Sequence, residues 1–274
     1  MASLYDRTDI YDLLENEDRF QTTKTHWQTV FAGKEIRTLL DVSIGSGNLT
    51  LPLCALGTAV TGSDLSETML GKCRAKAAAR GFSVELHQAD FRMLDRVFSG
   101  RLFDCVASTG NSLPYVANSE IPGVLCQMDA LVRTGGYLYL DLRNWDKIVA
   151  EKQRFYLYNP AFDGETRINL VQVWDHNADG TVDFNLLYTF ERDNCIFQKE
   201  FFTERYHPVP RALLLDTLFQ LGYQAPQLFC MPAQFTGRTQ SRPTGTVFWH
   251  RKHKKHARTG VFFAVHFRVR RFSM

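Results

Sequence analysis

Two acidic residues and two glycines stand at spacings that suit the binding of a nucleoside. The segment DVSIGSG places Asp41 at the end of an apolar run and then turns through Gly45 and Gly47. Glycine lets a backbone approach a ligand closely and adopt torsion angles that other residues resist. A second apolar run ends in Asp64, where a carboxylate can accept two hydrogen bonds from a ribose diol. A strand, a Gly-x-Gly turn, a helix, a second strand and a terminal acid, in this order, predict a cofactor site.

Two cofactors that contain a ribose suit such a site, a nicotinamide dinucleotide and S-adenosylmethionine. A dinucleotide fingerprint needs a third glycine that lets the helix pack closely, and Thr50 stands at that position. Asp41, four residues before Gly45, suits either the amino group of the methionine moiety or the ordering of the glycine loop. The turn therefore favours S-adenosylmethionine.

The third apolar run, SVELHQADF, adds candidate contacts for an adenine ring. Asp90 can accept a hydrogen bond from the adenine amino group, and Phe91 can pack near the ring. Met69, in SETML, is a candidate for the opposite face of the ring. Two of these residues have structural alternatives, because Asp90 also suits a helix N-cap and Met69 also suits helix packing. Thr109, near the end of the fourth strand, completes the set of candidate cofactor residues.

Together these segments resemble the class I S-adenosylmethionine-dependent methyltransferases. DVSIGSG, GSDLSETML, QADF and the ends of the fourth and fifth strands carry the resemblance, which covers about residues 36–250. It implies a methyl-transferring enzyme with S-adenosylmethionine as its cofactor and a small-molecule methyl acceptor. Ser43 and Ile44 depart from the small residue or cysteine that the family often has before the glycine turn.

Two segments narrow the resemblance to glycine N-methyltransferase and the glycine/sarcosine methyltransferases, namely STGNSLPYV (108–116) and LDLRNWDKI (140–148). In those enzymes an Asn and an Arg hold a small amino-acid substrate, and the matching positions here are Asn111 and Arg143. Both fall at carboxyl ends of adjacent strands, where ligands bind in open α/β sheets, and arginine can bind a carboxylate with two parallel bonds. The alternatives are an ion pair between Arg143 and Asp146 and a turn-forming role for Asn111.

Tyrosines crowd the segments that can cover this site. Related enzymes use tyrosine hydroxyls around the methionine moiety and the substrate, and the nearest matches are Tyr158, Tyr188 and Tyr206. An aromatic wall can also hold a cationic amine, although each tyrosine taken singly suits core packing as well. Tyr115 stands where the glycine enzymes tend to have a histidine, and this difference argues against glycine itself as the acceptor.

The elements that must position these residues alternate between strand and helix up to Trp145. This alternation predicts an α/β fold with a doubly wound, Rossmann-like, mostly parallel sheet of seven strands. Residues 166–205 instead show alternating, aromatic-rich stretches with turns at 177–180 and 192–194, which predict an antiparallel insertion after the fifth strand. A helix at 210–221 and two more strands are expected to follow.

The same patterns divide the chain into regions. We expect a helical N-terminal lid over residues 1–35 and a methyltransferase domain over 36–250, in which the insertion at about 150–207 covers the active site. From Arg251 onward there are Lys and Arg but no acid, whereas residues 1–250 hold 24 basic and 29 acidic residues. We therefore interpret residues 251–274 as a basic tail that is disordered or a reading-frame artefact.

Several classes of protein and site are not expected. No apolar run reaches ~18 residues and the acidic N-terminus does not resemble a signal peptide, so we expect a cytoplasmic protein without a membrane partner. The six cysteines form no CxxC pair and the histidines are scattered, which predicts no metal site. An acidic body, and GNSLPY in place of an Asn/Asp-Pro-Pro-Tyr/Phe motif, argue against a nucleic-acid acceptor. A homo-oligomer is compatible with the sequence.

The function expected from these features is methyl transfer to the nitrogen of a small amine or amino acid, by in-line displacement. Positioning both reactants is worth up to ~7–11 kcal/mol in such a reaction. Two alternatives stay open: O- or C-methylation of a small metabolite, and binding of S-adenosylmethionine without turnover. The acceptor is not identified by the sequence.

Overall fold

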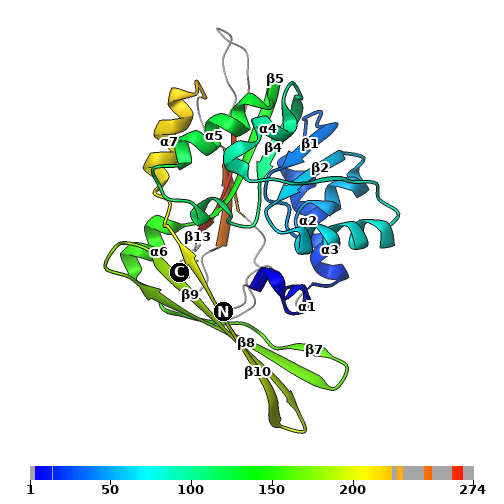
Figure 1. Cartoon of the computed structure of the whole chain (residues 1–274), viewed down its shortest axis with the longest axis vertical. Coiled ribbons are helices and arrows are strands. Elements are labelled where there is room, and N and C mark those ends of the chain that lie inside the picture. Colours follow the sequence, from blue (N-terminus) through cyan, green and yellow to red (C-terminus); the bar gives the residue numbers. More distant parts are fainter. Residues whose placement is uncertain (1–3, 14, 224–226, 231–243, 249–260, 268–274) are drawn as a thin grey trace, which may run out of the picture.

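The computed structural model describes residues 4–13, 15–223, 227–230, 244–248 and 261–267. An eight-stranded sheet and a five-stranded sheet form its two halves, and Figure 1 shows the short N-terminal helix α1 (Thr8–Tyr11) between them. Among the helices of these ranges, none combines the length and the apolar character that crossing a membrane would require.

The eight-stranded sheet is mostly parallel and has the order β11-β12-β13-β5-β4-β1-β2-β3. Its strands are β1 (Thr38–Asp41), β2 (Ala59–Asp64), β3 (Glu85–Gln88), β4 (Phe103–Ser108), β5 (Val132–Arg143), β11 (Gln227–Cys230), β12 (Thr244–Phe248) and β13 (Val261–Phe267). Asp41 pairs with Gly62 of β2 and with Ala107 of β4, so the carboxyl ends of these three strands meet at one edge. The candidate site residues follow this edge.

Helices pack on both faces of this sheet, and some of them begin at a side chain that caps them. The α-helices after α1 are α2 (Glu17–Val30), α3 (Glu67–Ala79), α4 (Asp95–Phe98), α5 (Ile121–Ala130), α6 (Trp145–Glu151) and α7 (Arg211–Gln220). Single 3-10 turns occur at η1 (Leu4–Asp6), η2 (Leu51–Leu56), η3 (Phe91–Met93) and η4 (Leu113–Tyr115). Asn16 caps α2, Ser66 caps α3 and Asn144 caps α6, each by accepting a hydrogen bond from a backbone amide of the first turn.

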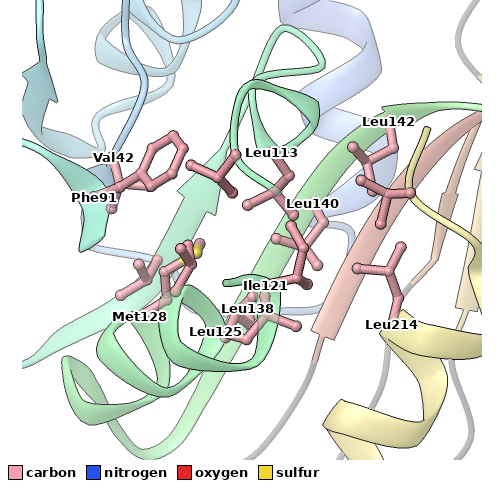
Figure 2. Close-up of a cluster of buried hydrophobic side chains, with 14 of the residues drawn as sticks. Val42, Phe91, Leu113, Ile121, Leu125, Met128, Leu138, Leu140, Leu142 and Leu214 are labelled. Atoms are coloured by element: carbon pink, nitrogen blue, oxygen red, sulfur yellow. The ribbon is translucent and has the colours of Figure 1, made fainter. Parts of the chain in front are cut away.

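The hydrophobic core has two layers because successive residues of a buried strand point to opposite faces. In β5, Leu138, Leu140 and Leu142 belong to one buried cluster with residues of α5 and α7, and Figure 2 shows Leu142 beside Leu214 of α7. Tyr139 points the other way and contacts Trp27 of α2, with 4.5 Å between the ring centroids. Burial on both faces keeps β4 and β5 rigid, and therefore fixes the residues at their ends.

The five-stranded sheet is antiparallel throughout and lies between α6 and α7 in the sequence. Its strands are β6 (Phe155–Leu157), β7 (Ala161–Asp163), β8 (Thr166–His176), β9 (Val182–Arg192) and β10 (Cys195–Tyr206), in the order β10-β9-β8-β6 with β7 also paired to β8. Asp193 and Asn194 both have positive φ and join the paired residues Arg192 and Cys195, as a two-residue hairpin turn requires.

The N-terminal segment packs on the inner face of this second sheet. Leu4 and Ile10 are buried in one cluster with Ile168, Leu170 and Tyr188. On the same face, further along β8 and β9, aromatic side chains pack against α6 of the other half. The two sheets therefore share a core, and residues 4–11 lie against it.

The structure differs from the sequence-based expectation at the far edge of the larger sheet. It has eight strands rather than seven, and β13 lies within residues 251–274, which we had interpreted as a disordered tail. The segment VFFAVHF has the apolar, β-branched and aromatic composition of a buried strand, and the surrounding basic residues obscure it. The rest of the expected tail, residues 251–260 and 268–274, lies outside the described residues.

Candidate active site

A cavity of 390 Å³ opens at the carboxyl ends of β1, β2, β3 and β4. Five of the eight predicted cofactor residues line it, namely Gly45, Asp64, Asp90, Phe91 and Thr109. The parallel register brings these segments together, because each follows the end of a neighbouring strand. Such an edge is where open α/β sheets bind their ligands.

The glycine loop after β1 is held from below by Asp41. Burial raises the pKa of this carboxyl group to about 6, although hydrogen bonds from Thr50, Thr109 and Ser43 oppose the rise. The carboxylate is fully buried and does not line the cavity. Of the two roles considered for Asp41, the structure therefore favours the ordering of the loop over contact with a ligand.

Two other predicted cofactor residues support the loop rather than line the cavity. Gly47 has φ 83°, and a Cβ atom there would lie 2.7 Å from Cys73 Sγ and from Leu51 Cγ. Met69 is fully buried behind Gly45, 3.4 Å from where a Cβ atom of Gly45 would lie. Met69 does not line the cavity, so of the two roles considered for it the structure favours helix packing over contact with an adenine ring.

Asp64 presents a carboxylate to the cavity with fixed orientation. One oxygen accepts a hydrogen bond from the Gly45 amide at 2.9 Å and the other accepts one from the Ser66 amide at 2.9 Å. Burial raises its pKa, while these backbone hydrogen bonds lower it. Each oxygen retains a lone pair, so the group fits a vicinal diol.

Apolar and acidic groups line the far end of the same cavity. Phe91 is buried there, and Leu65 lines the wall with 60% of its surface exposed. Asp90 caps η3 through the Arg92 amide and also holds the Arg92 guanidinium, and these hydrogen bonds lower its pKa. The N-cap alternative for Asp90 is therefore present, and its carboxylate still lines the cavity beside Phe91.

A second cavity of 380 Å³ adjoins the first. Residues that line both are Tyr5, Tyr11, Asn48, Leu49, Gly110 and Glu204. The second cavity lies between the carboxyl end of β5 and the inner face of the antiparallel sheet. All five residues predicted to hold or surround the acceptor line it, namely Asn111, Arg143, Tyr158, Tyr188 and Tyr206.

Arg143 extends from the end of β5 between two aromatic rings. Its guanidinium carbon lies 5.0 Å from the ring centroid of Trp174 and 4.8 Å from that of Phe184. Asp146, the partner considered from the sequence, pairs with Arg211 instead. Within the described part of the chain Arg143 forms no ion pair, and its Nε atom is buried without a hydrogen bond. The charge is available to a ligand carboxylate.

Asn111 occupies a left-handed turn with φ 61° directly after Gly110. Its Oδ1 atom accepts hydrogen bonds from the Arg143 amide at 3.0 Å and from Trp145 Nε1 at 3.1 Å. These contacts fix the amide, and its Nδ2 atom is buried without a partner among the described residues. Asn111 thus combines the turn role and a free donor at the cavity.

Tyrosine hydroxyls connect the two cavities. Tyr5 and Tyr115 share a hydrogen bond of 2.6 Å, and Tyr115 and Tyr206 share one of 2.9 Å. Burial raises the pKa of Tyr206, so the hydroxyl stays neutral near pH 7. Deeper in the second cavity, Tyr158 accepts a hydrogen bond from Gln172.

Several residues that line the site were not selected from the sequence. Asp141 and Glu204 bring acidic groups to the second cavity, and Trp174 and Phe184 flank Arg143. The sequence does indicate Asp141, because it lies inside the apolar run LYLDL. A buried acid costs free energy unless it is paired or hydrogen-bonded, so its presence there suggests a function. Glu204 carries no such signal, since it stands between polar residues in a strand that has several charged side chains.

Comparisons with known proteins agree with this geometry. Residues 39–136 match the family model of the methyltransferase domain. An S-adenosylmethionine-dependent methyltransferase from Clostridium acetobutylicum has the same fold, with a TM-score of 0.64 at 15% identity over 94% of this chain and 96% of that chain. A sugar N-methyltransferase from Streptoalloteichus gives a TM-score of 0.63 at 17% identity, over 98% and 94%. Residues 39–136 are thus similar to a methyltransferase domain, and the fold is that of S-adenosylmethionine-dependent methyltransferases.

Two related sequences are N-methyltransferases of small amino acids. The glycine/sarcosine/dimethylglycine N-methyltransferase of Actinopolyspora halophila is 25% identical over 219 residues, which is 78% of this chain and 36% of that protein. The glycine/sarcosine N-methyltransferase of Parasynechococcus marenigrum is 32% identical over 114 residues, which is 41% of this chain and 40% of that protein. The matches thus span well under two thirds of the relatives' own length.

Proposed function

We propose that this protein transfers the methyl group of S-adenosylmethionine to the nitrogen of a small amine that carries a carboxylate. The observation that carries the proposal is Arg143, an arginine between two aromatic rings that no described carboxylate pairs. It lies in a cavity that meets the cofactor cavity at Gly110. The likeness to glycine/sarcosine methyltransferases supports the same acceptor class.

The residues of the first cavity fit S-adenosylmethionine. Asp64 would hold the ribose diol, Leu65 and Phe91 would contact the adenine ring, and Thr109 and Gly110 lie at the end toward the second cavity. When bound, the cofactor supplies an electrophilic methyl group on a positively charged sulfur. The protein contributes position: the loop at Gly45 and the end of β4 fix where that methyl lies relative to Gly110.

The residues of the second cavity would hold the acceptor with its nitrogen toward Gly110. Arg143 would bind the carboxylate through parallel hydrogen bonds, which a planar guanidinium is shaped to form. The walls from Tyr188, Tyr206 and Phe184 exclude water from the reacting groups. A volume of 380 Å³ falls in the range of ordinary ligand pockets and accommodates an acceptor larger than glycine.

The test compares a carboxylate amine with its decarboxylated analogue on Arg143→Lys. Lysine keeps the charge and loses the two-pronged geometry, so we expect KM for the carboxylate amine to rise roughly 10- to 100-fold, about 1.5–3 kcal/mol. The analogue should change little. Arg167→Lys, on the antiparallel sheet and paired with Glu191, serves as the control and should behave like the wild type.

Product analysis by mass spectrometry separates the rival functions in the same assay. N-methylated product from the carboxylate amine supports the proposal, whereas O- or C-methylated product identifies the other small-molecule class. Cofactor binding without any methylated product would identify a binding protein. An equal loss on both substrates in Arg143→Lys would show that Arg143 supports the fold and does not clamp a carboxylate.

A further inference from the structure

At the carboxyl ends of β4 and β5, three buried polar atoms of residues that line the second cavity have no hydrogen-bond partner in the described part of the chain. They are Asn111 Nδ2, Asp141 Oδ1 and Arg143 Nε. Asn111 and Asp141 are each less than one tenth exposed. A buried polar atom without a partner costs roughly 1–3 kcal/mol, so three around one cavity indicate that a ligand supplies the partners.

The three atoms are complementary to a zwitterion, a ligand that carries both a carboxylate and an ammonium group. Two are donors, on Asn111 and Arg143, and suit a carboxylate. The third is a carboxylate oxygen on Asp141 and suits an ammonium group. Asp141 and Arg143 are two residues apart on β5, so their side chains leave the same face of the strand.

Backbone contacts place Asp141 next to the junction of the two cavities. Its Oδ2 atom accepts a hydrogen bond from the Gly110 amide at 3.0 Å, and its carbonyl oxygen accepts one from the Asn111 amide at 3.1 Å. Gly110 lines both cavities. The orientation of the carboxylate is thus fixed by one oxygen, while Oδ1 is buried without a hydrogen-bond partner in the described part of the chain, on a residue that lines the acceptor cavity.

We propose that Asp141 is a catalytic residue that binds the ammonium group of the acceptor and accepts its proton before methyl transfer. The inference rests on the proposed function and adds a proton acceptor to it. The proton moves from nitrogen to Asp141 Oδ1, which leaves a neutral amine with a lone pair. That lone pair forms the N–C bond as the C–S bond breaks and its electron pair stays on sulfur. The carboxyl group then releases its proton to water.

The electrostatic surroundings suit this role. The pKa of Asp141 is raised to about 7, chiefly by burial and in small part by the nearby Asp41, although the Gly110 amide and Arg143 oppose the rise. Tyr139, on the same strand, stays neutral because burial and Asp141 raise its pKa. These are the charged and titratable groups that act on Asp141 from β1, β5 and the turn after β4. A carboxyl group with this pKa is a stronger base than an ordinary one and is ionised above about pH 7.

The experiment measures kcat/KM from pH 6 to pH 10.5 for the wild type and Asp141→Asn, with an aliphatic carboxylate amine. Asparagine can still accept the Gly110 hydrogen bond and cannot take a proton. We expect Asp141→Asn to be slower by about 10²-fold near pH 7.5, with the gap closing as the free amine becomes the main form at high pH. Asp104→Asn, at the opposite edge of the sheet, is the matched control and should show no gap that depends on pH.

A wild-type measurement keeps the test decisive if Asp141→Asn does not fold. A weakly basic amine is neutral at pH 6 and needs no base. With the aliphatic amine the wild-type kcat/KM should fall below pH 7, and with the weakly basic amine this fall should be absent. A fall that persists with this amine, or a wild-type to variant ratio that is constant with pH, would overturn the role of Asp141. Absence of methylated amine in every wild-type assay would instead overturn the proposed function.

Discussion

At the scale of single residues, Asp64 has the clearest assignment. Two backbone amides fix its carboxylate toward the first cavity, and each oxygen keeps a lone pair for a ribose hydroxyl. The neighbouring acid Asp41 is also buried, but both of its carboxylate oxygens accept hydrogen bonds from the protein, namely from Ser43, Thr50 and Thr109. Two acids at similar places in the sequence thus have different tasks, because only one of them lines the cavity.

We predict that Asp64→Ala weakens S-adenosylmethionine binding by roughly 2–4 kcal/mol, because it removes two charge-assisted hydrogen bonds. Isothermal titration calorimetry measures the loss, and a melting curve without ligand shows whether the fold is intact. Asp163→Ala, on an exposed end of β7, is the matched control. Unchanged affinity in Asp64→Ala, or wild-type binding of a nicotinamide dinucleotide in place of S-adenosylmethionine, would refute the assignment.

Residues at strand ends could be placed from the sequence because the topology gathers those ends at one edge. Asn111 and Arg143 were found in this way, and the structure brings them to one cavity. The direction of a side chain within a turn or a helix does not follow from spacing. For this reason the sequence left two roles open for Met69, which is buried and does not line the cavity, and Asp141 was overlooked inside an apolar strand.

At the scale of elements, the N-terminal segment is held to the cofactor loop by one side chain. Asp12 Oδ1 accepts hydrogen bonds from Ser46 Oγ at 2.9 Å and Asn48 Nδ2 at 2.9 Å, and it pairs with Lys76 Nζ at 2.7 Å. Asp12 directly follows α1, which carries Tyr11 into both cavities. This attachment positions the segment that covers the site.

We predict that Asp12→Ala loosens residues 4–13 and weakens cofactor binding by about 1–2 kcal/mol, because three partly buried contacts are lost. Limited proteolysis should cut the N-terminal segment faster than in the wild type, and added cofactor should restore only part of the protection. Asp18→Ala, in the exposed first turn of α2, should leave both readouts unchanged. Wild-type proteolysis rates in Asp12→Ala would show that the attachment does not hold the segment.

The turn at residues 193–194 was predicted from the sequence, whereas strand β13 was not. The turn at Asp193 and Asn194 was visible because short polar residues tolerate positive φ. β13 was not, because its apolar run is flanked by basic residues that suggested an unstructured tail. Whether a strand forms between two partner strands is decided by the few residues of that strand. The net charge of residues 251–274 as a whole does not reveal the apolar run within them.

At the scale of the whole molecule, β13 connects the edge of the larger sheet to its centre. It pairs in parallel with β5 and antiparallel with β12. Its backbone lies opposite Asp141 and Arg143, through the pairs with Ala264 and His266. β13 therefore supports the strand that carries Asp141 and Arg143, the proposed acceptor residues.

We predict that deleting residues 251–274 lowers the melting temperature by several degrees, because β5 loses the backbone pairing with β13. In a chain of this size each kcal/mol of lost stability lowers the melting temperature by roughly 2–4 °C. Acceptor KM should rise more than cofactor Kd. Differential scanning fluorimetry and steady-state kinetics measure both. A deletion variant with wild-type melting and kinetics would show that the basic composition of this region is a better guide than its strand pairing.

Tyr5 and Tyr11 line both cavities, so each ligand meets the same two side chains. A ligand that orders the N-terminal segment spares the other ligand that entropic cost, which makes the two bind with positive heterotropic cooperativity. Thermodynamic linkage requires the factor to be equal in both directions. An acceptor analogue should therefore tighten the binding of the demethylated cofactor product, and a titration of that product with and without the analogue measures the factor.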